Sequence, residues 1–301
     1  MIARLMIGSN PLVGVDHFSF ERARKVRLEE SEEKALQVLR TAFAAGATGF
    51  TFSPGLRAIN LLKGMRDSKD GSRIRLYPVL PALEKYWPAF MAKGTYGLVS
   101  SVLEDLSWAG KAKAMIRGGA AALTSNPLSS LGLYIDVELE KIKAASPEHW
   151  QIDTVFLGEM FTDMALSLGA TNLLRTYRDA VERSGRFTAG LQTRNFAKLV
   201  AVLKTGGWTG RFPVVMAPFN PIGFQMTPTR EKCEEAATGL VGLDVVGISV
   251  LAAGQLGLRE ACSYLRGKDY IKSVAIGTSD PKHAKETFEF LAGNFRHDDL
   301  F

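Results

Sequence analysis

The stretch "SVAIGTSDPKHAKETFEFL" (Ser273–Leu291) contains a strand signal followed directly by a helix signal. Its first residues, Ser273–Thr278, form a short apolar run without polar alternation, which is typical of a parallel strand covered on both faces. Asp280 and Pro281 then form a strong helix start. The apolar residues behind them fall on one helix face: Ala284, Phe288 and Leu291. We predict a strand that passes through a tight loop into a helix.

The same unit of strand and helix recurs along most of the chain. Seven further apolar runs of strand length precede amphipathic stretches: Arg4–Ser9, Gly49–Ser53, Ile74–Leu80, Asp153–Gly158, Phe187–Thr193, Pro213–Phe219 and Asp244–Val250. Eight such units in 301 residues predict an α/β fold, a closed (β/α)8 TIM barrel rather than an open sheet. We therefore expect one barrel domain over residues 1–301.

Two more of the predicted helices begin at recognisable caps. Ser31 precedes an acidic first turn, and Gly46 ends the helix that follows it. Asn195 precedes a helix with one apolar face that Gly206 and Gly207 stop. These signals set the helix boundaries before any tertiary packing is considered.

The region of residues 83–150, between the third and fourth strands, departs from the regular alternation of strands and helices. It is mostly helical in pattern and rich in Ala and Gly, so we interpret it as a helical insertion in the barrel. An extra layer on the barrel flank and a lid over the mouth are both open, and we favour the flank. Within the region, Leu133–Glu140 competes with Ile152–Met160 for the fourth strand. We choose Ile152–Met160, because it is more apolar and precedes a good helix.

Charge and hydropathy narrow the class of ligand. The chain has 37 Lys and Arg against 31 Asp and Glu, a formal net charge of +6 without any block of like charge. This pattern argues against a nucleic-acid partner and favours a small anionic or phosphorylated ligand. No uncharged apolar run reaches the roughly 20 residues that a membrane span needs, and the N-terminal stretch does not resemble a signal peptide. We expect a cytoplasmic protein without a membrane partner, and the oligomeric state stays open.

Neither the cysteines nor the histidines have metal-ligand spacing. Cys233 and Cys262 fall in predicted helices and are interpreted as small buried apolar groups. There is no His-x-His or His-Glu-x-x-His sequence, so we predict no metal site. Glu159 and Asp163 form the alternative, a Mg²⁺ site completed by waters, although such a pair at a helix start is usually just solvated.

In a (β/α)8 barrel the loops after the strands build the active site. The loop after the first strand, "NPLVGVDHFSF" (Asn10–Phe20), brings Asp16 and His17 to the mouth. Neighbouring side chains on an extended segment point apart, so these two do not pair with each other. We hypothesise instead that His17 and Glu159 form an acid–base pair across the mouth, with Asp16 as a further catalytic candidate.

Other polar residues at strand ends are candidates for substrate binding. Arg194 suits a bidentate contact with a carboxylate or phosphate, and Gln192 precedes it after the fifth strand. Asn10 and Asn220 each precede a proline at a strand end, where the amide can face a ligand. Each candidate has a structural alternative. Those alternatives are a loop-stabilising Asp16, a hydrogen-bonded His17, a helix-capping Glu159, a rim charge at Arg194 and a solvated Asp163.

The loops after the last two strands suggest a phosphate site. Gly254 and Gly277 let backbone N–H groups approach an anion, and Thr278 and Ser279 add hydroxyls. The helix that starts at Asp280 contributes its positive end, with His283 in its first turn. The alternative is that these small residues only make tight turns.

The last third of the chain resembles the aldo-keto reductases. In that family a Ser-Pro-Leu-Ala-x-Gly-x-Leu segment ends the seventh strand and a Gly-x-Ser loop ends the eighth. Here the matching residues are Ser249–Leu256, which include Leu251 and Gly254, and Gly277–Ser279. "GLQTRNFAKL" (Gly190–Leu199) and "PFNPIG" (Pro218–Gly223) match in outline. The resemblance implies a nicotinamide cofactor, NAD(P), with Leu251 and His283 among its contacts.

The family's catalytic residues, a Tyr with an adjacent Lys, Asp and His, have no evident counterparts. Thr51 stands near the Asp position, Leu56 near the Tyr position, and Gly158 or Glu159 replaces the His; the Gln beside the nicotinamide falls at Met216. Three residues near the third loop are candidates for a relocated donor, or simply amphipathic surface residues: Tyr77, Lys85 and Tyr86.

Three functions remain open at this point. The favoured one is an enzyme that performs acid–base chemistry, as an isomerase, lyase or hydrolase, on a small phosphorylated or anionic metabolite. The second is a divergent NAD(P)H-dependent reductase with a relocated proton donor. The third is a non-catalytic sensor or binding protein, because the barrel architecture hosts many activities.

Overall fold

The computed structural model describes residues 2–14, 31–67, 73–82 and 127–295. Every strand pairing in these ranges is parallel. The strands are β1 (Leu5–Gly8), β2 (Gly49–Phe52), β3 (Arg75–Leu80), β4 (Gln151–Ile152), β5 (Thr154–Leu157), β6 (Thr188–Gln192), β7 (Val214–Pro218), β8 (Asp244–Ile248) and β9 (Ile271–Ile276). The sheet closes because β1 pairs with both β2 and β9, and β2 pairs with β3.

The predicted (β/α)8 barrel is confirmed. Both β4 and β5 pair with β3, and only Asp153 separates them. Together they therefore occupy one of the eight strand positions of the barrel. Each predicted strand is present within a few residues of its expected bounds, since continuous apolar runs suit strands covered on both faces.

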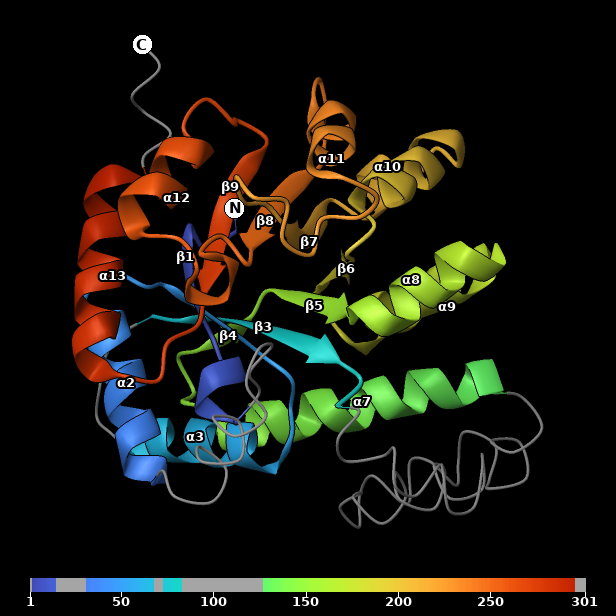
Figure 1. Cartoon of the computed structure of the whole chain (residues 1–301). Helices are drawn as coiled ribbons and strands as arrows, with labels where there is room; N and C mark the ends of the chain where they lie inside the picture. Colours follow the sequence, from blue (N-terminus) through green and yellow to red (C-terminus); the bar gives the residue numbers. More distant parts are fainter. Residues whose placement is uncertain (1, 15–30, 68–72, 83–126, 296–301) are drawn as a thin grey trace.

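Helices surround the sheet (Figure 1). They are α2 (Glu32–Ala44), α3 (Leu56–Asp67), α7 (Pro127–Ala145), α8 (Glu159–Leu168), α9 (Thr171–Ser184), α10 (Phe196–Thr205), α11 (Arg230–Ala237), α12 (Leu258–Leu265) and α13 (Pro281–Asn294). Three short 3-10 turns accompany them in the described part of the chain: η1 (Asn10–Leu12), η2 (Thr209–Arg211) and η3 (Ala252–Gly254). The last helix, α13, packs on the first described one, α2, so the helical ring closes as the sheet does.

The predicted caps are observed. The Ser31 hydroxyl accepts a hydrogen bond from the Lys34 amide at 3.2 Å, and the Asn195 side chain accepts one from the Lys198 amide at 3.3 Å. The Asp280 carboxylate accepts two, from the Lys282 and His283 amides. Local sequence therefore starts these three helices.

The competing candidate for the fourth strand, Leu133–Glu140, lies inside α7. Its buried apolar residues Ile135, Leu139 and Ile142 recur at the spacing of a helix, which explains why the segment is not a strand. Helix α7 packs against α3 and α9 on the barrel flank, and the choice between flank and lid for the rest of the insertion stays a prediction. Residues 83–126 of the predicted insertion lie outside the described residues.

Two apolar clusters hold the barrel together. The larger one lies between the strands and the helices, and the smaller one fills the barrel interior: Ala3, Met6, Tyr77, Phe156, Val214, Met216, Val246 and Ala275. Tyr77 belongs to the interior, is 0% exposed, and accepts a hydrogen bond from the Ala3 amide at 2.6 Å. The interpretation of Tyr77 as a surface residue or a relocated proton donor is therefore wrong. Burial raises its pKa far above the usual value, and it does not line the mouth.

Among the described residues, no helix combines the length and the apolar character that crossing a membrane requires.

Candidate functional site

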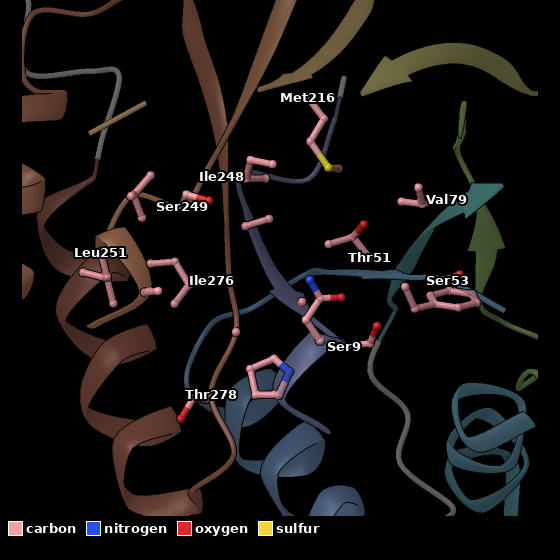
Figure 2. A pocket seen from close by; sticks show the side chains of 18 of the residues that line it. Ser9, Thr51, Ser53, Val79, Met216, Ile248, Ser249, Leu251, Ile276 and Thr278 are labelled. Atoms are coloured by element: carbon pink, nitrogen blue, oxygen red, sulfur yellow. The ribbon is translucent and has the colours of Figure 1, made fainter. Parts of the chain in front are cut away.

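A cavity of about 600 Å³ lies at the carboxyl ends of the barrel strands. Its wall includes residues from β2, β3, β6, β7, β8 and β9, together with the turns that follow β1, β8 and β9. The volume is in the range of sites for small molecules and cofactors. Figure 2 shows Ser9, Thr51 and Ser53 on one side of the cavity, and Ile248, Leu251 and Ile276 on the other.

Nine of the residues selected from the sequence line this cavity: Asn10, Glu159, Gln192, Leu251, Gly254, Gly277, Thr278, Ser279 and His283. Asp16 and His17 lie outside the described residues, so their roles and the pairing of His17 with Glu159 stay predictions. Lys85 and Tyr86 also lie outside them. The remaining two candidates, Arg194 and Asn220, are described but are not part of the lining.

Arg194 does not line the cavity itself, but it forms an ion pair with Glu159, which does. Its guanidinium donates to the Glu159 carboxylate at 2.5 Å, and both side chains are partly exposed. Glu159 is the first residue of α8, and Gly158 is the one residue that separates it from β5. Its carboxylate is thus held by an ion pair at the mouth instead of capping its helix.

Asp163, one turn further along α8, forms hydrogen bonds to the loop that follows β6. Its carboxylate accepts a hydrogen bond from the Thr193 hydroxyl and another from the Arg194 amide at 3.0 Å. The interpretation of Asp163 as a solvated helix residue is therefore wrong, because its carboxylate bonds the turn after β6. These bonds place Arg194 where it can reach Glu159.

Asn220 shapes the loop after β7. Its side chain is 0% exposed, donates to the carbonyl oxygens of Phe224 at 2.9 Å and Ser249 at 3.2 Å, and accepts from the Phe224 amide at 2.7 Å. The amide is thus fully used inside the protein. The structure gives Asn220 the role of joining the loop after β7 to the turn after β8.

The loop after β7 carries Gln225, which the sequence did not reveal, and the turn after β8 begins with Ser249, the first residue of the segment Ser249–Leu256 that carries the resemblance. Gln225 and Ser249 line the cavity, and the Ser249 hydroxyl donates to the Gln225 amide oxygen at 3.0 Å. Both have left-handed backbones, with φ of 61° and 52°, and Ala253 at 54° follows them. Non-glycine residues rarely adopt this conformation, and it persists where surrounding contacts impose it. No hydrophobic periodicity signals such backbone conformations.

The loops after β8 and β9, for which we predicted a phosphate site, differ from the expectation in one respect. Pro281 has no N–H group, the Lys282 and His283 amides bond to the Asp280 carboxylate, and the Ala284 amide bonds to the Asp280 carbonyl. The helix start is therefore satisfied internally and carries a carboxylate, so α13 does not supply free N–H groups to an anion. The polar groups left at this side are the Ser279 hydroxyl, the His283 ring and the loop backbone, which is open at Gly254.

Gly277 is required for a different reason than an approach to phosphate. A Cβ at this position would lie 2.6 Å from Cδ and 2.8 Å from Cγ of Pro11. The glycine thus lets the end of β9 pack against η1, which follows β1. This contact fixes the corner of the cavity between the first and last strands.

Of the residues that the resemblance sets at the family's positions, Thr51 (the Asp position) and Met216 (the Gln beside the nicotinamide) line the cavity, whereas Leu56 (the Tyr position) begins α3, is 74% exposed and lies outside the lining. Ser9, Thr51 and Ser53, which we call the hydroxyl cluster, come from the ends of β1 and β2. Sequence reasoning missed Ser9 and Ser53. Serine and threonine are common at turns, so nothing in the pattern distinguished them.

The described residues contain no group of three or more His, Cys, Asp or Glu side chains that could hold a metal ion. Cys233 and Cys262 are free and buried, as predicted from their helical positions. Burial raises the pKa of both thiols, which makes them poor nucleophiles.

The sequence matches no family model and no curated protein. The fold does match solved structures. A putative aldo-keto reductase from Pseudomonas aeruginosa aligns over 97% of this chain and 91% of its own, with 13% identity and a TM-score of 0.58. An aldo-keto reductase from Bacillus halodurans, in its holo form, aligns over 95% of this chain and 85% of its own, with 12% identity and a TM-score of 0.52.

A third structure, an aldo-keto reductase from Klebsiella pneumoniae in complex with NADPH, aligns over 100% of this chain and 93% of its own, with 12% identity and a TM-score of 0.51. At such identities the likeness concerns the fold. The chain therefore shares the barrel fold of the aldo-keto reductases.

Proposed function

We propose that this protein is an oxidoreductase that binds a nicotinamide dinucleotide across the barrel mouth and interconverts a carbonyl compound and its alcohol. The observation that carries the proposal is the extent of the cavity. It continues from His283, in the first turn of α13, past the turns after β8 and β9 to Met216 within β7 and Gln192 at the end of β6. One elongated ligand with phosphates at one end and a reactive group at the other suits this shape.

The residues present fit such a cofactor. At the phosphate side, Ser279 and His283 offer uncommitted polar side chains, and no protein atom occupies the space beside Gly254. Toward the strand ends the wall becomes apolar, with Val79, Ile248 and Ile276 among its residues. The similar structure from Klebsiella pneumoniae binds NADPH, which supports the same class of cofactor here.

The cofactor, when bound, supplies the hydride, so the protein must supply a site for the proton. Tyr77 is excluded by its position in the interior. Among the described lining residues, Glu159 is the titratable group at the end of β5, and the Arg194 ion pair fixes its carboxylate. We assign the proton transfer to Glu159: its carboxylate accepts the proton from the substrate hydroxyl during oxidation, and in the reverse direction it takes a proton from solvent and passes it to the substrate oxygen.

Turnover with a panel of aldehydes and ketones tests this function. Reduced nicotinamide should be consumed in proportion to the alcohol formed, and Glu159→Gln should lower kcat by about 100-fold or more, with binding of NADPH unchanged. Lys285→Gln, on the exposed side of α13, is the matched control and should leave the rate unchanged. Turnover that persists at the wild-type rate in Glu159→Gln would remove the assigned role of this residue.

One observation supports a second candidate, acid–base chemistry on a small phosphorylated or anionic metabolite. Glu159 and Arg194 bring a carboxylate and a guanidinium together at the mouth. This pair could move a proton without a redox cofactor. A thermal-shift screen separates the two, because a ligand that binds only the folded state raises the melting temperature. Stabilisation by triose or sugar phosphates, with none by NADPH or NADH, would favour this candidate.

A further inference from the structure

We propose that Asp163 is a positioning residue, which holds the Arg194 guanidinium on Glu159 and so keeps the Glu159 carboxylate at the wall of the cavity. This inference rests on the proposed function, because it concerns the proton transfer that we assign to Glu159. Asp163 does not line the cavity, so its influence on a bound substrate must pass through another residue. The residue through which it acts is Arg194.

The first reason is that both carboxylates of α8 bond to the same residue. Glu159 and Asp163 lie one turn apart, so their side chains leave the same side of the helix. The Glu159 carboxylate accepts from the Arg194 guanidinium at 2.5 Å, and the Asp163 carboxylate accepts from the Arg194 main-chain amide at 3.0 Å. Two like charges at this spacing destabilise a helix unless a common partner compensates. Arg194 is that partner, bound by one helix through its side chain and its backbone.

The second reason is that the ion pair alone does not fix the guanidinium. Its Nη2 atom bonds to Glu159, whereas its Nε atom is buried and makes no hydrogen bond within the described residues. The Arg194 side chain is 40% exposed and that of Glu159 is 30% exposed. A contact through one atom between two partly exposed side chains is weak. The place of the guanidinium therefore depends on how the backbone of Arg194 is held.

That backbone is anchored from two directions. On the side of α8, the Asp163 carboxylate accepts from the Thr193 hydroxyl as well as from the Arg194 amide. The same hydroxyl accepts from the Asn195 amide at 2.9 Å, and Thr193 is 0% exposed, so water does not compete for these bonds. On the other side, the Arg194 carbonyl accepts from the Thr227 amide, in the loop after β7, at 2.9 Å. Asp163 thus ties the turn after β6 to α8.

Glu159 has a second position open to it if this anchor is lost. It is the first residue of α8, and the N-cap residue, Gly158, has no side chain that could bond the first amides of the helix. A carboxylate in the first turn is attracted to the positive end of its own helix. Without Arg194 in place, we expect Glu159 to turn toward those amides and away from the substrate oxygen.

Asp163→Asn is the sharpest substitution, because asparagine keeps the size of the side chain and one acceptor oxygen but loses the charge. With the best substrate of the aldehyde and ketone panel, we expect kcat to fall by about 10-fold, the effect of one charge-assisted hydrogen bond. The KM for NADPH should not change, since His283 lies in another part of the cavity wall. In the Glu159→Gln background the same substitution should cost less than about 2-fold, because a residue that acts through Glu159 has no further effect there.

Thr193 supplies a second variant and α7 supplies the control. Thr193→Val removes the hydroxyl and should lower kcat as Asp163→Asn does, and Thr193→Ser, which keeps the hydroxyl, should restore it. Asp136→Asn is the matched control, because Asp136 also accepts from a hydroxyl of a neighbouring helix, that of Ser184, but lies on α7 outside the cavity lining. It should leave kcat unchanged.

Phenylglyoxal, which modifies accessible guanidinium groups, gives a readout that needs no turnover. Modification of Arg194, followed by mass spectrometry of its peptide, should be several-fold faster in Asp163→Asn than in the wild type and unchanged in Asp136→Asn. Two results would overturn the proposal: equal modification of Arg194 in the wild type and Asp163→Asn, or an equal loss of kcat from Asp163→Asn in the wild-type and Glu159→Gln backgrounds.

The two readouts separate this proposal from the proposed function. If Asp163→Asn exposes Arg194 to phenylglyoxal while the wild type consumes no NADPH with any carbonyl compound, the positioning role of Asp163 is upheld and the proposed function is wrong. If NADPH turnover depends on Glu159 but not on Asp163 or Thr193, the proposed function stands and the positioning role is wrong.

Discussion

The two sides of the cavity are built in opposite ways. On the side of β7 and β8, Asn220 uses all of its amide within the protein, and Ser249 is bonded to Gln225. On the side of β1 and β2, the hydroxyls of Ser9, Thr51 and Ser53 have no partner in the described protein. The first side is a rigid wall whose shape is set by its own bonds. The second side has hydroxyl groups that make no hydrogen bonds within the described protein.

This difference shows how a cavity wall combines stability with binding. Residues that hold a loop in place cannot at the same time offer the same atoms to a ligand, because each donor or acceptor has a limited number of partners. Substitutions on the side of β7 to β9 should therefore lower stability, whereas substitutions in the hydroxyl cluster should not.

The largest effect should come from Gly277→Ala. The added Cβ would lie 2.6 Å from the Pro11 ring, which cannot rotate away, so β9 and η1 must separate. We expect a loss of about 3 kcal/mol in the free energy of unfolding, measured by urea denaturation. Gly257→Ala is the control, because its Cβ would meet no atom within 4 Å and its φ is −75°. A Gly277→Ala protein as stable as the wild type would mean that this corner of the cavity is not packed as described.

Asn220→Ala should have the next largest effect. The substitution leaves the carbonyl of Ser249 and both main-chain groups of Phe224 without their side-chain partner inside a buried loop. We expect a loss of about 2 kcal/mol, again from urea denaturation. Asn294→Ala removes an exposed amide that bonds to the Phe290 carbonyl, and should change stability by less than about 0.5 kcal/mol. Equal effects of the two substitutions would contradict the role given to Asn220.

The hydroxyl cluster should respond in the opposite direction. Ser9→Ala removes a buried oxygen that has no partner, so the ligand-free protein should gain about 1 kcal/mol. For a domain of this size the melting temperature would rise by about 2 °C. Ser273→Ala removes a buried hydroxyl that donates to the Ala3 carbonyl, and should lower the melting temperature. A clear loss of stability in Ser9→Ala would show that its hydroxyl does have a structural partner.

The smallest effect should be a pH dependence at the start of α13. Hydrogen bonds from the His283 and Lys282 amides hold the pKa of Asp280 below its ordinary value of 3.8. A lowered pKa means that the charged form stabilises the fold above pH 3.8, and that this contribution disappears as the pH falls through the lower folded value.

Asp280→Asn isolates this charge, because asparagine is also a good capping residue. The wild type should be slightly more stable than the variant at neutral pH, and the difference should vanish as the pH falls through the lowered pKa of Asp280. Thermal melts of both proteins between pH 2 and pH 7, roughly the range over which a carboxyl titrates, measure it. A difference that grows in acid would contradict the assignment.

The sequence predicted the barrel well because its signals are local. Strands such as Asp244–Ile248 are continuous apolar runs, and Ser31, Asn195 and Asp280 are capping residues whose bonds reach only two or three positions along the chain. Leu133–Glu140 was the ambiguous segment, since its β-branched residues suit a strand while the spacing of its buried residues suits a helix. Packing against α3 and α9 decides in favour of the helix.

The site was predicted in part, because the barrel itself brings strand ends together. Glu159, Gln192 and Gly254 were expected at the mouth from topology alone, and they line the cavity. The sequence could not show which polar groups the fold already uses. Asp163 and Asn220 are committed to neighbouring loops, whereas Ser9 is not, and only three-dimensional contacts distinguish them.

The central claim is that a nicotinamide dinucleotide binds across the mouth, and titration of the wild-type protein with NADPH by calorimetry tests it most directly. The account predicts saturable binding with one equivalent per chain and a Kd below about 1 mM, the usual range for enzyme ligands. Addition of NADPH should also raise the melting temperature in proportion to the logarithm of its concentration above Kd. No heat of binding and no thermal shift at millimolar NADPH would contradict the account.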